Sequence, residues 1–99
     1  MLKINKHLDG SNLCIGLIGR LDTMSAPELD KEIKSSIEGV TDLVLDLAEL
    51  DYLSSSGLRV ILSAQKVMNK QGRMTIIHVN DMIMDIFEVT GFSEILTIQ

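Results

Sequence analysis

The sequence has little aromatic surface, with no tryptophan, one tyrosine and two phenylalanines among its 99 residues. Aromatic platforms on which nucleic-acid bases could stack are therefore missing. Basic residues are also scarce, because nine Lys and Arg stand against fourteen Asp and Glu and give a net charge of −5. Nucleic-acid surfaces need a clustered basic footprint. We expect no nucleic acid among the partners of this chain.

Cysteine and long apolar runs are scarce as well. The single cysteine, Cys14, cannot form an internal disulfide, which is typical of proteins in a reducing cytoplasm. The apolar runs fall far short of the roughly 18 residues of a membrane span, and no signal-peptide pattern is present. Together with the absence of linkers and repeats, this predicts one domain over residues 1–99, located in the cytoplasm and not inserted into a membrane.

Apolar periodicity predicts strands alternating with helices. The expected strands cover residues 2–8, 13–18, 43–47, 74–79 and 94–98. The expected helices run from Ser25 to about Glu38, from the serines before Gly57 to Gly72, and from Asn80 or Asp81 to about Val89. Asp9-Gly10 is a hairpin signal, so the first strand should be antiparallel at the sheet edge. The order predicts an α/β fold with a mainly parallel sheet and helices between the strands.

Finer details of these elements also follow from the pattern. The second strand is almost continuously apolar, which predicts cover on both of its faces. Ser25 and Glu28 have the spacing of a capping box, and Leu29, Ile33 and Ile37 form one apolar stripe. The second helix is expected to direct five side chains inward, namely Leu58, Ile61, Leu62, Val67 and Met68.

Three adjacent serines, Ser54, Ser55 and Ser56, precede the second helix. Because a helix start needs one capping hydroxyl, at least one of the three is free for another role. Functional residues in open α/β sheets collect at the carboxyl ends of strands, and two expected loops, 19–25 and 48–56, leave such ends. These loops would gather Asp22, Thr23, Asp51 and the serines on one edge of the domain.

Catalytic machinery is not visible around these serines. A serine nucleophile needs a nearby base, and the only histidines, His7 and His78, are expected in strands. A Gly-x-Ser-x-Gly motif, a phosphate loop and spaced metal ligands are all missing, so we expect no enzyme, cofactor or metal. The serines could serve only as capping and turn residues. Alternatively, one could carry a phosphate, whose charge of about −1.5 to −2 would act on whatever docks there.

Three segments occur in a characteristic order: Gly19–Asp22 with Ser25–Leu29, then Leu45–Leu47 through Tyr52–Leu58, then Thr90–Phe92. In these segments the chain resembles the STAS domains, most closely the bacterial anti-sigma factor antagonists. The resemblance implies a phosphorylation-controlled, partner-switching protein. Its unphosphorylated form would bind an anti-sigma factor that is also a serine kinase and so release the sigma factor. A PP2C-type phosphatase would reset the switch.

The resemblance also implies roles for individual residues. Family antagonists commonly read Asp-Ser-Ser/Thr-Gly here, so Ser55 matches the phosphoacceptor on the register of Gly57. Because Ser54 stands at the usual Asp position, Ser54 and Ser56 remain alternatives, with a capping role expected for Ser56. The implied partner-binding residues are Asp22, Thr23, Ser54, Ser56, Gly57 and Leu58.

Two further readings stay open. STAS-like domains also serve as constitutive accessory subunits of lipid-transport ABC complexes, and that role needs no kinase. Others are modules of larger signalling complexes or bind small ligands. Family members usually add a C-terminal helix after the last strand, whereas this sequence ends at Gln99. Either that helix is dispensable, or an apolar face is left for a partner or for a second copy in a homodimer. Apolar residues of the third helix, including Met82 and Met84, could suggest a partner groove, although their spacing fits a core-facing helix better.

Overall fold

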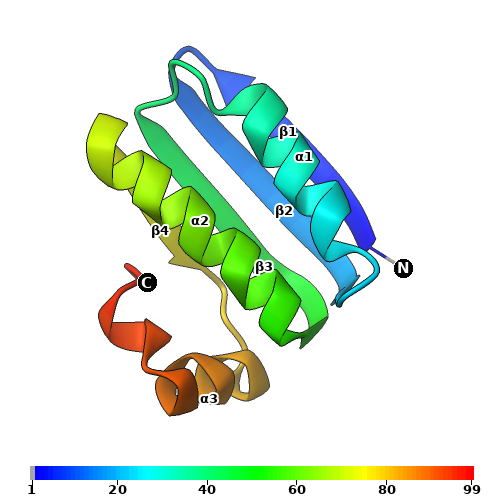
Figure 1. The fold of residues 1–99 in the computed structure, drawn as a ribbon. Coiled ribbons are helices and arrows are strands. Elements are labelled where there is room, and N and C mark those ends of the chain that lie inside the picture. Colours follow the sequence, from blue (N-terminus) through cyan, green and yellow to red (C-terminus); the bar gives the residue numbers. More distant parts are fainter. Residues whose placement is uncertain (1) are drawn as a thin grey trace.

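The computed structural model describes residues 2–99, which form one four-stranded sheet in the order β1-β2-β3-β4 (Figure 1). Strand β1 (Leu2–Asp9) runs antiparallel to β2 (Asn12–Leu21). Strands β2, β3 (Asp42–Leu53) and β4 (Arg73–Ile77) are mutually parallel. The predicted α/β class, with a mainly parallel sheet and one antiparallel edge strand at the N-terminus, is confirmed.

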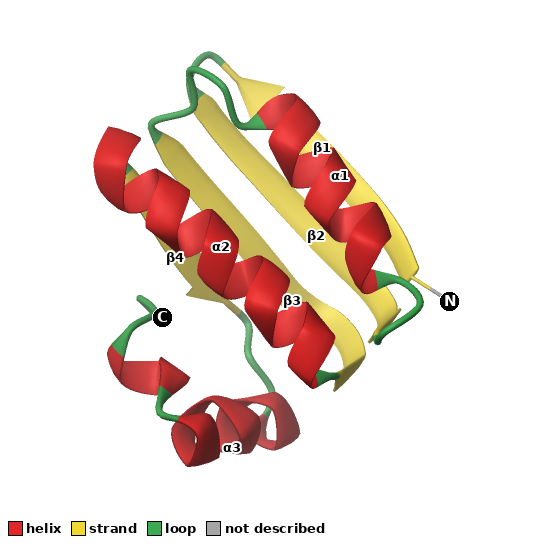
Figure 2. Ribbon diagram, viewed as in Figure 1, coloured by secondary structure: helices red, strands yellow, loops and turns green. Residues whose placement is uncertain are grey.

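Helices α1 (Ala26–Ser36) and α2 (Ser55–Gln71) connect β2 to β3 and β3 to β4. Both connections step across the sheet in the same direction, so two right-handed crossovers put both helices on one face, as Figure 2 shows. Helix α3 (Asp81–Thr90) lies beyond the carboxyl end of β4 (Figure 1). Within residues 2–99, no helix combines the length and hydropathy needed to cross a membrane.

The core lies between the sheet and the two crossover helices. In α1 the predicted stripe of Leu29, Ile33 and Ile37 is buried. In α2 the inner face is formed by Leu58, Ile61, Ala64, Gln65 and Met68. Val67, which was expected to point inward, is exposed, because it lies one residue off this inner face on a helix of 3.6 residues per turn.

The prediction that β2 is covered on both faces is wrong. Leu13, Ile15 and Leu17 are buried, whereas the alternating Cys14 and Gly16 are only half-buried. Since α1 and α2 occupy the same face of the sheet, no helix within the described chain covers the other face of β2 (Figure 2). We call this second surface the open face.

Strand β3 is longer than its apolar run predicts. It was expected to end at Leu47, but it continues to Leu53 because its second half pairs with β2, with Leu50 opposite Gly19 and Leu53 opposite Leu21. Two register irregularities between β2 and β3, each with one extra residue in β3, accommodate this longer ladder. Most of the expected loop over 48–56 is therefore strand, and α2 begins almost directly after it.

The last expected strand, over 94–98, is not formed. Residues Phe92–Glu94 make a short 3-10 helix, and only Ile98 bridges to Ile76 of β4. The turn continues through the bond that the N–H of Leu96 donates to the Phe92 carbonyl at 2.9 Å, so few residues remain to pair. Strand β4 also ends earlier than expected, at Ile77, before His78 adopts a left-handed φ of 58°.

Candidate functional site

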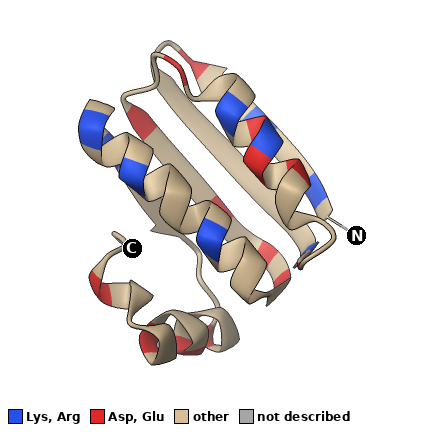
Figure 3. Cartoon of the chain, in the orientation of Figure 1, with Lys and Arg blue, Asp and Glu red and all other residues tan. Residues whose placement is uncertain are grey.

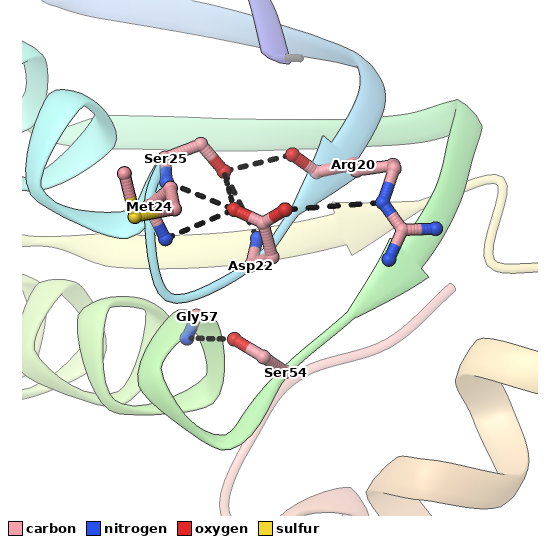
Figure 4. Close-up of polar contacts among 6 residues, drawn as sticks. All are labelled: Arg20, Asp22, Met24, Ser25, Ser54 and Gly57. Carbon is pink, nitrogen blue, oxygen red and sulfur yellow. Dashed lines mark hydrogen bonds and ion pairs between the residues drawn. The ribbon is translucent and has the colours of Figure 1, made fainter.

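The carboxyl ends of β2 and β3 are joined directly. The N–H of Ser54 donates to the carbonyl of Leu21 at 2.9 Å, immediately after the last strand pair, Leu21 with Leu53. This bond joins the two strand ends, and the loop after β2 lies beside the start of α2, as Figure 4 shows. We call residues 20–25 and 52–59 the site edge. The two chain segments that the sequence predicted to meet here therefore do meet.

The three serines of the site edge differ in their surroundings. Ser54 is the N-cap of α2, and its Oγ accepts a hydrogen bond from the N–H of Gly57 at 3.2 Å. Ser55 is the first helical residue and is exposed, while Ser56 is half-buried. The capping role expected for Ser56 is wrong, because Ser54 fills it. With the cap supplied by its neighbour, Ser55 presents its side chain to solvent.

Gly57 and Leu58 lie beneath this surface, and both are buried. A Cβ on Gly57 would stand 2.6 Å from Cγ of Leu21 and 2.9 Å from Cδ1 of Leu53. Only glycine lets the first turn of α2 approach the two strand ends so closely. These residues therefore determine where the serines stand.

Asp22 organises the other half of the site edge. Its Oδ1 accepts hydrogen bonds from the N–H groups of Met24 and Ser25, both at 3.0 Å (Figure 4). The Ser25 hydroxyl donates to the carbonyl of Arg20 at 2.8 Å and accepts from the N–H of Asp22 at 2.9 Å. The expected capping box of Ser25 with Glu28 is thus wrong: Ser25 makes no side-chain cap and instead closes the loop.

These bonds set the charge state of Asp22. The hydrogen bond from the Ser25 N–H, with smaller contributions from the Ser25 hydroxyl, the Met24 N–H and Arg20, holds the pKa of the Asp22 carboxyl below its ordinary value. The carboxylate is therefore ionised at neutral pH. Thr23, at the tip of the same loop, is exposed.

Three residues of the site edge were not singled out from the sequence. The Arg20 guanidinium lies 4.2 Å from the centre of the Tyr52 ring, and these two residues are paired across β2 and β3. Met24 is 85% exposed on the loop that Asp22 orders. The Arg20–Tyr52 contact could be predicted only from the pairing of β2 with β3. That pairing requires β3 to extend to Leu53.

Titratable groups also meet on the open face. His78 Nδ1 lies 2.9 Å from Oδ1 of Asp46, near a hollow of about 420 Å³ that Cys14 and Asp46 help to line. Burial by itself would raise the pKa of Asp46, but hydrogen bonds from His78 and the Ala48 N–H, with the charge of His78, lower it. Burial raises the pKa of the Cys14 thiol, and Asp46 raises it further.

These groups do not assemble into a metal site, since among residues 2–99 no three His, Cys, Asp or Glu side chains are arranged to hold an ion. His78 is engaged with Asp46, and His7 lies on β1. The site edge itself combines the exposed hydroxyl of Ser55, the loop that Asp22 orders, and the opposite charges of Arg20 and Asp22.

Comparison with known proteins agrees with this fold. The anti-sigma-B factor antagonist of Listeria monocytogenes is 31% identical over 97 residues, which cover 95% of this chain and 84% of that protein. The crystal structure of an anti-sigma factor antagonist from Mycobacterium paratuberculosis superposes with a TM-score of 0.90 at 17% identity, over 99% of this chain and 85% of that one.

Two structures of SpoIIAA share the fold as well, both at 18% identity and over the whole of this chain. The unphosphorylated form matches with a TM-score of 0.78 over 87% of its own chain. The phosphorylated form, described as a Bacillus cell fate determinant, matches with 0.76 over 91%. The model of the STAS domain family matches residues 3–99. This chain therefore belongs to the STAS domain family.

Proposed function

We propose that this protein is an anti-sigma factor antagonist of the cytoplasm whose binding state is controlled by phosphorylation of Ser55. In its unphosphorylated form it binds an anti-sigma factor that is also a serine kinase, and so releases the sigma factor. The kinase ends the complex by phosphorylating Ser55, and a PP2C-type phosphatase restores the binding form. The names of its relatives support the antagonist role.

One observation carries the assignment of Ser55. Among the three adjacent serines, Ser55 combines an exposed position with a neighbour, Ser54, that already caps the helix. A kinase can therefore reach the Ser55 hydroxyl without uncapping α2. The alternatives, Ser54 and Ser56, are both half-buried.

The partner is proposed to cover the site edge. Asp22 and Thr23 lie on the ordered loop beside the start of α2, so a partner that reaches Ser55 also meets this loop. Ser54 and Ser56 border Ser55, while the buried Gly57 and Leu58 contribute by holding the first turn in place.

Phosphorylation would act on the interface and not on the fold. Ser55 makes no contribution to the core, and the positive end of the α2 dipole favours a negative group at the helix start by up to about 1 kcal/mol. Like charges brought together across an interface cost several kcal/mol, and each 1.4 kcal/mol changes affinity tenfold. One phosphate is thus sufficient to dissociate a micromolar complex.

The first test is intact-mass and phosphopeptide analysis after incubation with ATP and lysate of the source cells. We expect one phosphate on Ser55, absent from Ser55→Ala and retained in Ser63→Ala, which removes another exposed serine of α2. A phosphate on Ser54 or Ser56 would move the site within the cluster. No phosphate despite active kinases would contradict the switch and favour the constitutive accessory subunit of a lipid-transport ABC complex.

The second test measures binding to the purified anti-sigma kinase by calorimetry. Ser55→Ala should bind as tightly as the wild type and resist inactivation by ATP. Ser55→Asp should bind at least about tenfold more weakly, which corresponds to 1.4 kcal/mol. Both variants should melt within a few degrees of the wild type, because Ser55 is exposed. Unfolding of Ser55→Asp would show that the serine is structural.

A further inference from the structure

The chain contains three arginines, and they differ in their electrostatic partners. Arg20 contacts Asp22, with 3.8 Å between Nε and Oδ2, and lies over the Tyr52 ring. Arg73 pairs with Asp42. Among the ion pairs of the described residues, Arg59 takes part in none, and its side chain is exposed on α2. Arg59 is therefore a cation without a carboxylate partner.

Arg59 lies one helical turn after Ser55. Side chains four residues apart on an α-helix are neighbours on the same face, and α2 runs unbroken from Ser55 to Gln71. The first turn of α2 contains no acidic residue that would compete for Arg59. Along the whole helix the only charged residues are basic, as Figure 3 shows.

We propose that Arg59 is the intramolecular counter-charge of phosphorylated Ser55, pairing with the phosphate along the first turn of α2. The inference rests on the proposed function and specifies its regulation. A guanidinium binds phosphate through two parallel N–H donors, which gives a directed contact that a lysine ammonium cannot reproduce. Phosphorylation then changes the surface twice, since it adds negative charge at Ser55 and engages the free cation at Arg59.

This pairing has a consequence for how the phosphate titrates. A neighbouring cation favours the dianion over the monoanion, so Arg59 lowers the second pKa of the phosphate. An exposed helical ion pair changes such an equilibrium by about 0.2–0.4 in pKa. The phosphate is thereby kept in its more highly charged form near neutral pH, where the second pKa of phosphoserine ordinarily lies at about 6.

The test uses the full chain with phosphoserine incorporated at position 55 during translation, so no kinase is needed. Phosphorus NMR titrations at 0.15 M salt follow the phosphate in five backgrounds: wild type, Arg59→Gln, Arg59→Lys, Arg20→Gln and Lys66→Gln. We expect Arg59→Gln to raise the second pKa by about 0.2–0.4, with Arg59→Lys intermediate. Lys66→Gln removes a cation about 10 Å further along α2, beyond a Debye length of about 8 Å, and should leave the phosphate unchanged.

Other outcomes would overturn the pairing. An unchanged second pKa of the phosphate in Arg59→Gln, or an equal rise in Lys66→Gln, would show that Arg59 does not pair specifically with the phosphate. A rise in Arg20→Gln without one in Arg59→Gln would assign the counter-charge to Arg20, at the end of β2. These results are independent of the kinase assay, because failure of the host to phosphorylate Ser55 would refute the proposed function while the NMR result reports only on the pairing.

Discussion

The N–H of Ser54 donates to the Leu21 carbonyl at 2.9 Å, and this bond fixes the two halves of the site edge to each other. It joins the end of β2 to the residue that caps α2. The loop ordered by Asp22 and the exposed Ser55 therefore stand on one rigid support rather than on two independent loops. Because rigid elements hold a binding surface in a defined geometry, changes beneath the surface should alter function as well as stability.

Gly57→Ala should destabilise the protein by about 1–3 kcal/mol, because the new Cβ overlaps Leu21 and Leu53 beneath the first turn of α2. Urea denaturation followed by circular dichroism measures the loss. Gly16→Ala is the matched control, since a Cβ there meets only Cβ of Asn5 at 3.9 Å. Equal stability of the two variants would contradict the close approach of α2 to the strand ends.

Ser54→Ala should cost about 1 kcal/mol through loss of the cap that Ser54 provides to the Gly57 N–H. Ser55→Ala, one residue later and exposed, should change the free energy of unfolding by less than about 0.5 kcal/mol. Thermal and urea denaturation of both variants compares them directly. A larger loss in Ser55→Ala would mean that Ser55 is the structural serine.

Asp22 should make stability depend on pH in the acidic range. Its pKa in the folded protein is lowered, chiefly by the Ser25 N–H, so the carboxylate stabilises the fold above the unfolded pKa of about 3.9. That stabilisation is lost as the pH falls through the lower, folded pKa. Asp22→Asn should therefore lower the melting temperature at pH 6 more than at pH 3.

The control for this comparison is Asp51→Asn, which removes one exposed negative charge from β3 close to the site edge. Melting temperatures of both variants between pH 2.5 and 7 are compared with the wild type. Parallel profiles for the two variants would show that loss of charge, and not the hydrogen-bonded turn of Asp22, explains the effect.

Asp46→Asn should make the Cys14 thiol more reactive. Burial raises the pKa of this thiol and the negative charge of Asp46 raises it further, so removing the charge lowers the pKa and increases the thiolate fraction. We expect alkylation by iodoacetamide at pH 8 to accelerate about twofold or more. Glu49→Gln, in the wall of the same hollow, should leave the rate unchanged. An unchanged rate in Asp46→Asn would show that burial alone governs the thiol.

Asn80→Ala should destabilise the attachment of α3. The Asn80 side chain accepts a bond from the Ile83 N–H at 2.8 Å and donates to the Leu50 carbonyl at 3.1 Å, so it both caps α3 and ties it to β3. We expect a loss of about 1–2 kcal/mol. Hydrogen exchange should show faster opening of α3 than of α2, and uniform protection across both helices would contradict this.

The amino-acid sequence by itself determined the elements whose signals are local. The stripe of Leu29, Ile33 and Ile37 specifies the buried face of α1 because neighbouring turns of one helix share that face. Asp9-Gly10 specifies the hairpin between β1 and β2, and Asn80 the start of α3. The serine cluster also marked the start of α2, although not which hydroxyl caps it.

Only the tertiary structure decided the features that depend on pairing between distant segments. Strand β3 extends to Leu53 because β2 offers it a partner, and this extension brings Tyr52 beside Arg20. Residues near Ile98 lack such a ladder and form a single bridge. Ser25 closes a loop instead of capping α1, because its hydroxyl accepts from the Asp22 N–H and donates to the Arg20 carbonyl. Backbone N–H and C=O groups bond to partners that are often distant in the sequence. The residues next to such a group therefore do not identify its partner.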